Sequence, residues 1–146
     1  MTHLEDSIII KKSADEVYRI VCDVESHPKL MTYFRECKII KKDGNKVTVN
    51  RVAEIDGKIR SWVGEITFKP EKRSFDFKQI DGPLKGMTGE WICEPIDEGT
   101  KLIITHNINF NIPVFGKLVE LYVANKFVSK SARDGLKSIK NIIEKG

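Results

Sequence analysis

The sequence predicts an α+β protein in which a curved antiparallel sheet of seven strands wraps around a long C-terminal helix, with two short helices between strands 1 and 2. The first observation is that only Gly116 and Gly135 interrupt a helical pattern of about thirty residues, 113–145. The second is that six segments with two-residue alternation precede this helix at hairpin spacing, with no helix between them and one further strand before them. We therefore expect a curled sheet with the helix against its inner face.

The composition is typical of a globular chain that forms one domain over residues 1–146, because 40% of its residues are hydrophobic and 32% are charged. No apolar run approaches the roughly 20 residues of a membrane span, and the acidic start lacks the pattern of a signal peptide. Cys22, Cys37 and Cys93 are scattered, which indicates free thiols in a reducing cytoplasm and no metal site. A net charge of +4 requires no anionic partner, and we expect no nucleic acid.

The N-terminal elements are predicted from a strand pattern followed by a helix-capping signal. Residues 6–12 surround three consecutive isoleucines and are expected to form the first strand. Ser13 and Glu16 have the spacing of a capping box, in which the serine caps the helix and the glutamate bonds back. A short amphipathic helix follows, and a second helical turn begins at 26–28, where proline fits a first turn.

From Cys37 onward, the period of the apolar pattern is two, and turn residues separate the segments. We expect strands at 37–42, 47–55, 58–69, 73–80, 87–94 and 101–109.

Alternation along these strands separates an inner face from an outer one. The inner face holds both tryptophans, several phenylalanines and a few polar groups, which is the composition of a pocket for a small hydrophobic ligand. The ligand-binding candidates on this face are Arg51, Arg60, Trp62, Phe75, Phe77, Gln79, Met87, Trp91 and His106.

The C-terminal helix has an inner stripe that is large and apolar at both ends but small or polar in the middle. This pattern fits either a cavity roofed by the helix or a close contact of helix and sheet at Ala132. The stripe consists of Phe115, Leu118, Tyr122, Asn125, Ser129, Ala132, Leu136, Ile139 and Ile143, and Tyr122, Asn125 and Ser129 are the ligand-binding candidates within it.

Each polar candidate has two interpretations. His106 is either a functional group or a core histidine with a hydrogen-bond partner. Arg51 and Arg60 either bind an anionic or phenolic head group or extend to solvent from the strand ends. The basic row of Lys126, Lys130, Arg133, Lys137 and Lys140 is either a solvated face or a transient contact for a membrane surface or an acidic protein.

Segments 6–10, 14–18, 23–30, 61–63, 87–91 and 99–100 occur in an order and spacing that resemble the START-like helix-grip (SRPBCC) superfamily. The resemblance covers nearly the whole chain and is greatest to the branch of polyketide cyclases/dehydrases (aromatases) and coenzyme-Q-binding-like proteins. It implies a curved sheet that grips the C-terminal helix around an apolar cavity, and an activity that steers the folding, ring closure and dehydration of a poly-β-ketone.

The chain departs from the closest aromatase pattern at three positions. An arginine follows the central tryptophan on the inner face in that pattern, whereas Gly64 and then Ile66 follow Trp62 here. The tyrosine position after the second helix holds Phe34, with Tyr33 beside it. His27 stands where the family usually has a tryptophan before the helix proline. Arg60 or Arg51 is the candidate replacement for the missing charge.

Three functions follow from these observations. The first is a START-like protein that binds a hydrophobic small molecule, such as a lipid, a quinone or a polyketide-like aromatic, between sheet and helix. The sequence contains no recognisable nucleophile–base constellation or phosphate loop and indicates no cofactor. The second is a cyclase/dehydratase with His106, Tyr33 and Arg60 as catalytic candidates. The third is a docking protein that acts through Lys126, Lys130, Arg133 and Lys137.

Overall fold

A computed structural model of the protein describes residues 2–109 and 122–146. The expected beginning of the C-terminal helix, with Phe115 and Leu118, lies outside these residues. The described elements, in which η1 and η2 are 3₁₀-helices and η3 is a π-helix, are β1 Thr2–Ile10, α1 Ala14–Val21, η1 Val24–Ser26, α2 His27–Leu30, β2 Phe34–Asp43, β3 Lys46–Ile55, β4 Lys58–Lys69, η2 Pro70–Lys72, β5 Ser74–Asp81, β6 Thr88–Ile96, β7 Gly99–Ile108, η3 Ala124–Ser129 and α4 Lys130–Lys145.

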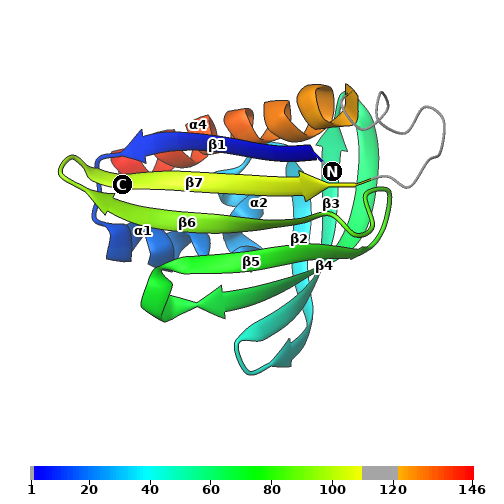
Figure 1. The fold of residues 1–146 in the computed structure, drawn as a ribbon, viewed down its shortest axis with the longest axis horizontal. Coiled ribbons are helices and arrows are strands. Elements are labelled where there is room, and N and C mark those ends of the chain that lie inside the picture. Colours follow the sequence, from blue (N-terminus) through cyan, green and yellow to red (C-terminus); the bar gives the residue numbers. More distant parts are fainter. Residues whose placement is uncertain (1, 110–121) are drawn as a thin grey trace.

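The seven strands form one antiparallel sheet in the order β1-β7-β6-β5-β4-β3-β2. Neighbouring strands of the sheet are consecutive in the chain except β1 and β7. These two are the first and the last of the described strands in the sequence, and they pair with each other at one edge of the sheet. Figure 1 shows that the sheet curls, so that β2 and β3 run across the direction of β7, while α1, α2 and α4 lie on one side. The predicted α+β arrangement is therefore confirmed, including the short helices between strands 1 and 2.

Two strand boundaries differ from the sequence prediction. β1 begins at Thr2 and ends at Ile10, because its polar N-terminal half is held by backbone pairing with β7, which hydropathy does not report. β2 begins at Phe34 instead of Cys37, and two register shifts interrupt its pairing with β3. Such bulges break the two-residue alternation from which a strand is predicted. β4 has the predicted bounds, and the remaining strands lie within two residues of theirs.

Local capping and burial follow the predicted pattern over most of the chain. The Ser13 hydroxyl accepts a hydrogen bond from the backbone N–H of Glu16 at 3.2 Å and so caps α1. Leu136, Ile139 and Ile143 of α4 are buried against the sheet. All three cysteines are free. No helix within the described ranges is long and apolar enough to cross a membrane.

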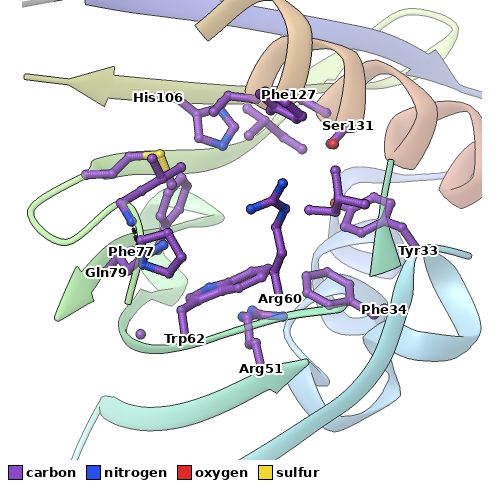
Figure 2. A pocket seen from close by; sticks show the side chains of 18 of the residues that line it. Tyr33, Phe34, Arg51, Arg60, Trp62, Phe77, Gln79, His106, Phe127 and Ser131 are labelled. Atoms are coloured by element: carbon purple, nitrogen blue, oxygen red, sulfur yellow. Dashed lines mark hydrogen bonds between the residues drawn. The ribbon is translucent and has the colours of Figure 1, made fainter. Parts of the chain in front are cut away.

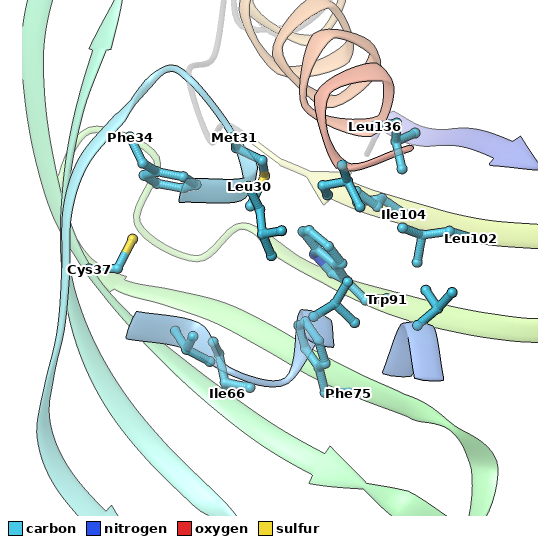
Figure 3. Close-up of a cluster of buried hydrophobic side chains, with 14 of the residues drawn as sticks. Leu30, Met31, Phe34, Cys37, Ile66, Phe75, Trp91, Leu102, Ile104 and Leu136 are labelled. Atoms are coloured by element: carbon cyan, nitrogen blue, oxygen red, sulfur yellow. The ribbon is translucent and has the colours of Figure 1, made fainter. Parts of the chain in front are cut away.

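The core lies under the C-terminal half of α4, where Trp91 and Phe75 of neighbouring strands stack with ring centroids 5.2 Å apart (Figure 3). Leu102 and Leu136 belong to the same buried cluster. Side chains therefore fill the space between the sheet and this half of α4, and the cavity described below lies beside this cluster.

The π-helix η3 changes which side chains face the sheet. A π turn closes i→i+5 hydrogen bonds, so it contains one more residue than an α turn. The residues that face the sheet on the N-terminal side of α4 are therefore displaced by one position from those that a 3.6-residue period predicts. Tyr122 (56% exposed) and Asn125 consequently face outward, which contradicts their predicted inner position. Val123 and Phe127 take the inner positions instead.

Candidate ligand-binding cavity

A cavity of about 520 Å³ lies between the inner face of the sheet and the segment η3–α4. Pockets for small molecules usually have volumes of about 300–1,000 Å³, so this one has room for a compact organic ligand. The side chains of η3 and α4 roof it, as the cavity hypothesis for the helix stripe required. Its lining is His27, Tyr33, Phe34, Arg51, Ile55, Arg60, Trp62, Gly64, Ile66, Phe75, Phe77, Lys78, Gln79, Pro83, Leu84, Met87, Trp91, Ile104, His106, Val123, Phe127, Val128, Ser131 and Ala132.

All nine ligand-binding candidates that alternation placed on the inner face of the sheet line this cavity. Successive side chains of a strand point to opposite faces of the sheet. Once one residue of a strand is known to face inward, every second residue of that strand is expected to face inward too. Their placement is therefore as expected, whereas their roles in ligand binding stay predictions.

The walls are aromatic on two sides. Phe34 packs against Trp62 with centroids 5.9 Å apart, and Tyr33 lies 4.7 Å from Phe34. Trp91 continues the wall towards the core and stacks on the imidazole of His27 at 5.6 Å. Flat, rigid walls of this kind bury the faces of a planar or elongated apolar molecule with little loss of side-chain entropy.

Arg60 is the polar group at the centre of the cavity. It lies on β4, and Figure 2 shows its guanidinium between Trp62 and Phe127. The guanidinium carbon lies 5.4 Å from the centroid of the Phe127 ring, a cation–π contact between sheet and helix. Its buried Nε has no hydrogen-bond partner among the described residues. Buried polar atoms are normally paired, so this N–H is available to a ligand.

Arg51, on β3, is held in place by neutral neighbours. Its Nη1 donates to Nδ1 of His27 at 3.1 Å and to the Cys37 sulfur at 3.1 Å, and its guanidinium lies 4.9 Å from the centre of the Phe34 ring. Burial raises the pKa of the Cys37 thiol. The group is therefore a positive charge at one wall of the cavity with no carboxylate among these contacts.

His27 is fully buried and neutral. Its Nε2–H donates to the backbone carbonyl of Val21 at 2.8 Å, which leaves Nδ1 as the acceptor for Arg51. Burial, and secondarily the charge of Arg51, lower its pKa to about 3. His27 thus positions Arg51 and, through the stack on Trp91, one wall.

His106 lies on β7 opposite Gly89 of β6, and its ring meets the ring of Phe77 edge-on at 5.2 Å. Its buried Nδ1 has no hydrogen-bond partner among the described residues, and burial lowers its pKa to about 4. His106 is therefore neutral near pH 7 and can accept a hydrogen bond or a proton from a ligand.

Gln79 and Tyr33 complete the polar lining. The buried Gln79 side chain accepts the backbone N–H of Leu84 at 2.6 Å and so fixes the loop after β5 against the cavity. The Tyr33 hydroxyl donates to the Met31 sulfur at 3.4 Å, and burial raises its pKa to about 12. Tyr33 therefore remains a proton donor at neutral pH.

Three helix candidates do not reach the cavity. Tyr122 and Asn125 face outward for the reason given above. Ser129 is buried but faces β1, where its hydroxyl donates to the Asp6 carboxylate at 3.2 Å and accepts from Arg133 at 2.6 Å. The predicted position of these three residues at the cavity is therefore wrong.

The basic row lies on the outer side of the helix. Lys126, Lys130 and Arg133 line an open depression together with Tyr122 and Asn125. Lys130 pairs with Asp134 at 3.0 Å, and Arg133 lies 3.8 Å from Asp6. These carboxylates neutralise part of the row, and its docking role stays a prediction.

Sequence reasoning missed His27 and Phe127 as cavity residues. His27 was noted only as a departure from the family pattern, and Phe127 lies outside the 3.6-residue stripe because η3 is a π-helix. A π turn has no reliable sequence signature. A pattern displaced by one residue on the N-terminal side of Ser129 is the signal that would have placed Phe127 on the inner face. Among the residues with described positions, no three His, Cys, Asp or Glu side chains converge to hold a metal ion.

Comparison with known proteins adds a family and relatives. The family described as "Polyketide cyclase / dehydrase and lipid transport" matches residues 10–128. A proposed polyketide cyclase from Streptomyces cyaneus is 30% identical over 103 residues, which is 68% of this chain and 68% of that protein.

Two solved structures are similar to this chain throughout. The Zhui aromatase/cyclase from a Streptomyces species superposes with a TM-score of 0.86 at 18% identity, over 99% of this chain and 94% of the other. A START superfamily protein from Mycobacterium smegmatis superposes with a TM-score of 0.79 at 16% identity, over 98% and 97% of the two chains. At these identities, the likeness shows a common fold.

Proposed function

Because the chain belongs to the polyketide cyclase/dehydrase and lipid transport family, we propose that it binds a hydrophobic small molecule between the sheet and the C-terminal helix. The observation that carries this proposal is an aromatic-walled cavity of about 520 Å³ in which the Nε of Arg60 has no partner among the described residues. Apolar walls bind the body of the ligand, and the few polar groups orient it.

The first test is native mass spectrometry of the purified protein, followed by denaturing extraction. A small molecule bound at a one-to-one ratio is expected. The site is tested by titrating naphthol, a planar apolar probe, and recording tryptophan fluorescence, because Trp62 and Trp91 both line the cavity.

Ala132→Phe tests the location of the ligand. Ala132 is buried on α4 and lines the cavity, so a phenyl ring there occupies ligand space. We expect at least a tenfold loss of naphthol affinity. Lys137→Phe places the same ring on the exposed side of α4 and is expected to bind as the wild type does. Equal affinity of wild type and Ala132→Phe would place the ligand elsewhere.

A second candidate function, cyclisation and dehydration of a poly-β-ketone, is favoured by the unpartnered Nδ1 of His106. As a neutral base, His106 would remove a proton from the carbon between two carbonyls, and Arg60 would stabilise the enolate oxygen. The enolate carbon would then attack a second carbonyl carbon, whose oxygen takes a proton from Tyr33. Loss of that hydroxyl as water, with a second α-proton, would give the unsaturated ring.

His106→Gln tests this reaction with a linear triketone thioester as the substrate. A general base contributes about 10²–10⁴-fold to a rate, so we expect cyclisation to slow by at least 100-fold while naphthol affinity changes little. The product is followed by its ultraviolet absorbance. An unchanged rate would exclude His106 as the base and leave the binding function standing.

A further inference from the structure

Two arginines face the same cavity from neighbouring strands. In the register of β3 and β4, Arg51 lies opposite Trp62 and Ala53 lies opposite Arg60, so the two arginines occupy diagonal positions of one face. Diagonal positions are separated by roughly 7–8 Å, within reach of long side chains. Both side chains line the cavity, and Figure 2 shows Arg60 extending further into it than Arg51.

Neither positive charge forms an ion pair with a carboxylate of residues 2–109 or 122–146. The ion pairs of the described residues involve other arginines and lysines, and the described part of the cavity lining contains no Asp or Glu. Arg51 contacts an imidazole, a thiol and an aromatic ring. The guanidinium of Arg60 lies over the ring of Phe127, and its Nε has no hydrogen-bond acceptor among the described residues.

A guanidinium cannot relieve this situation by losing its proton, because arginine stays protonated in proteins. A charge in apolar surroundings is unfavourable unless an opposite charge and hydrogen bonds accompany it. A neutral carbonyl would satisfy the Nε–H of Arg60 but would leave both charges unbalanced. A ligand with a negative charge would satisfy the N–H and balance the charge together.

We propose that the ligand of this cavity is an apolar carboxylic acid, bound as its carboxylate to Arg60, with Arg51 as the second positive charge. The proposal rests on the binding function proposed above and specifies the class of ligand. The two oxygens of a carboxylate match the parallel N–H groups of a guanidinium. A phosphate would need more donors, whereas the Nη1 of Arg51 is already engaged by His27 and Cys37.

The apolar part of such an acid lies along the aromatic side of the cavity. Trp62 adjoins Arg60 on the same face of β4, and Phe77 and Met87 line the cavity from the adjoining part of the sheet. The cavity thus places the charged group of Arg60 beside aromatic and apolar side chains, which is the arrangement that recognises an amphiphilic anion.

The test compares acids with neutral analogues of the same shape, namely naphthoic acid with naphthol and dodecanoic acid with dodecanol. Affinities are measured at pH 8, where the acids are ionised, by calorimetry and tryptophan fluorescence. A hydrogen bond to a charged group contributes about 1.5–3 kcal/mol, so we expect each acid to bind about 10- to 100-fold more tightly than its alcohol.

Arg60→Gln is expected to remove this preference by weakening the acids 10- to 100-fold and the alcohols much less. Lys58→Gln is the matched control, because it removes the same charge from an exposed position two residues away on β4 and is expected to keep the preference. Arg60→Lys is expected to keep part of it. A thermal melt of ligand-free Arg60→Gln verifies folding, and its melting temperature is expected to equal or exceed that of the wild type.

Two results would overturn the proposal while the binding function stands. One is equal affinity of the wild type for acids and alcohols, and the other is an acid preference that survives in Arg60→Gln. If neither acids nor alcohols bind the wild type, both the proposal and the binding function are wrong.

Discussion

Gly89 lies where β5, β6 and β7 meet under the cavity, opposite Phe77 on one side and His106 on the other. A Cβ added at Gly89 would overlap the carbonyl oxygen of Thr105 and the ring of Phe77. Gly64 lines the cavity, and a Cβ there would lie 3.5 Å from the carbonyl oxygen of Lys78, which is an ordinary contact. The two glycines therefore make a matched pair for one extra methyl group.

The overlap at Gly89 involves backbone as well as a side chain, so it cannot be relieved by a rotamer change alone. Overpacking usually destabilises a protein by about 1–3 kcal/mol, and we place Gly89→Ala at the upper end, near 3 kcal/mol. Gly64→Ala is expected to be neutral or to stabilise the protein by about 0.5 kcal/mol, because alanine restricts the unfolded chain. At about 3 °C per kcal/mol for a chain of this size, Gly89→Ala should melt roughly 10 °C lower.

Urea unfolding followed by circular dichroism gives both free energies of unfolding. Gly89→Ala should also weaken naphthol binding, since Phe77 and His106 must move when the ring is displaced. The close approach of Thr105 and the Phe77 ring to Gly89 would be wrong if the free energy of unfolding of Gly89→Ala lies within about 1 kcal/mol of the wild-type value. It would also be wrong if Gly64→Ala is the less stable of the two variants.

Two further predictions concern buried histidines and the helix roof. The folded pKa values of His27 (about 3) and His106 (about 4) lie below the 6.5 of a free imidazole, so between pH 6.5 and 4 the unfolded chain binds more protons. The free energy of unfolding should therefore fall as the pH is lowered through this window, by up to about 1.4 kcal/mol per pH unit for each histidine. Urea titrations at pH 7, 6 and 5 measure the slope, and His106→Leu should reduce it by about half; an unchanged slope would contradict the burial of His106. For the roof, Phe127→Ala should weaken naphthol binding about tenfold, because Phe127 lines the cavity and covers Arg60, while Tyr122→Ala should bind as the wild type does. The opposite ranking in a fluorescence titration would mean that the inward face of η3 is assigned incorrectly.

The sequence alone was sufficient for the inner face of the sheet. Alternation has a fixed period of two, so Trp62 on β4 and Trp91 on β6 could be placed inward without knowledge of the partners of their strands. It also identified the cap at Ser13 and the buried stripe of α4, because a cap and a 3.6-residue period depend only on neighbours along the chain.

What the sequence determined by itself is therefore the order of elements, the inner face of the strands and the composition of a cavity. The tertiary structure decided which polar groups of that cavity have partners. Arg51 is held by His27 because α2 packs against β2, the neighbour of β3 in the sheet, while the Nε of Arg60 finds no acceptor among the described residues. The tertiary structure also decided that η3 is a π-helix, which turned Tyr122 outward and Phe127 inward. The physical reason is that periodicity is local, whereas hydrogen-bond partners and helix phase depend on residues brought together by folding.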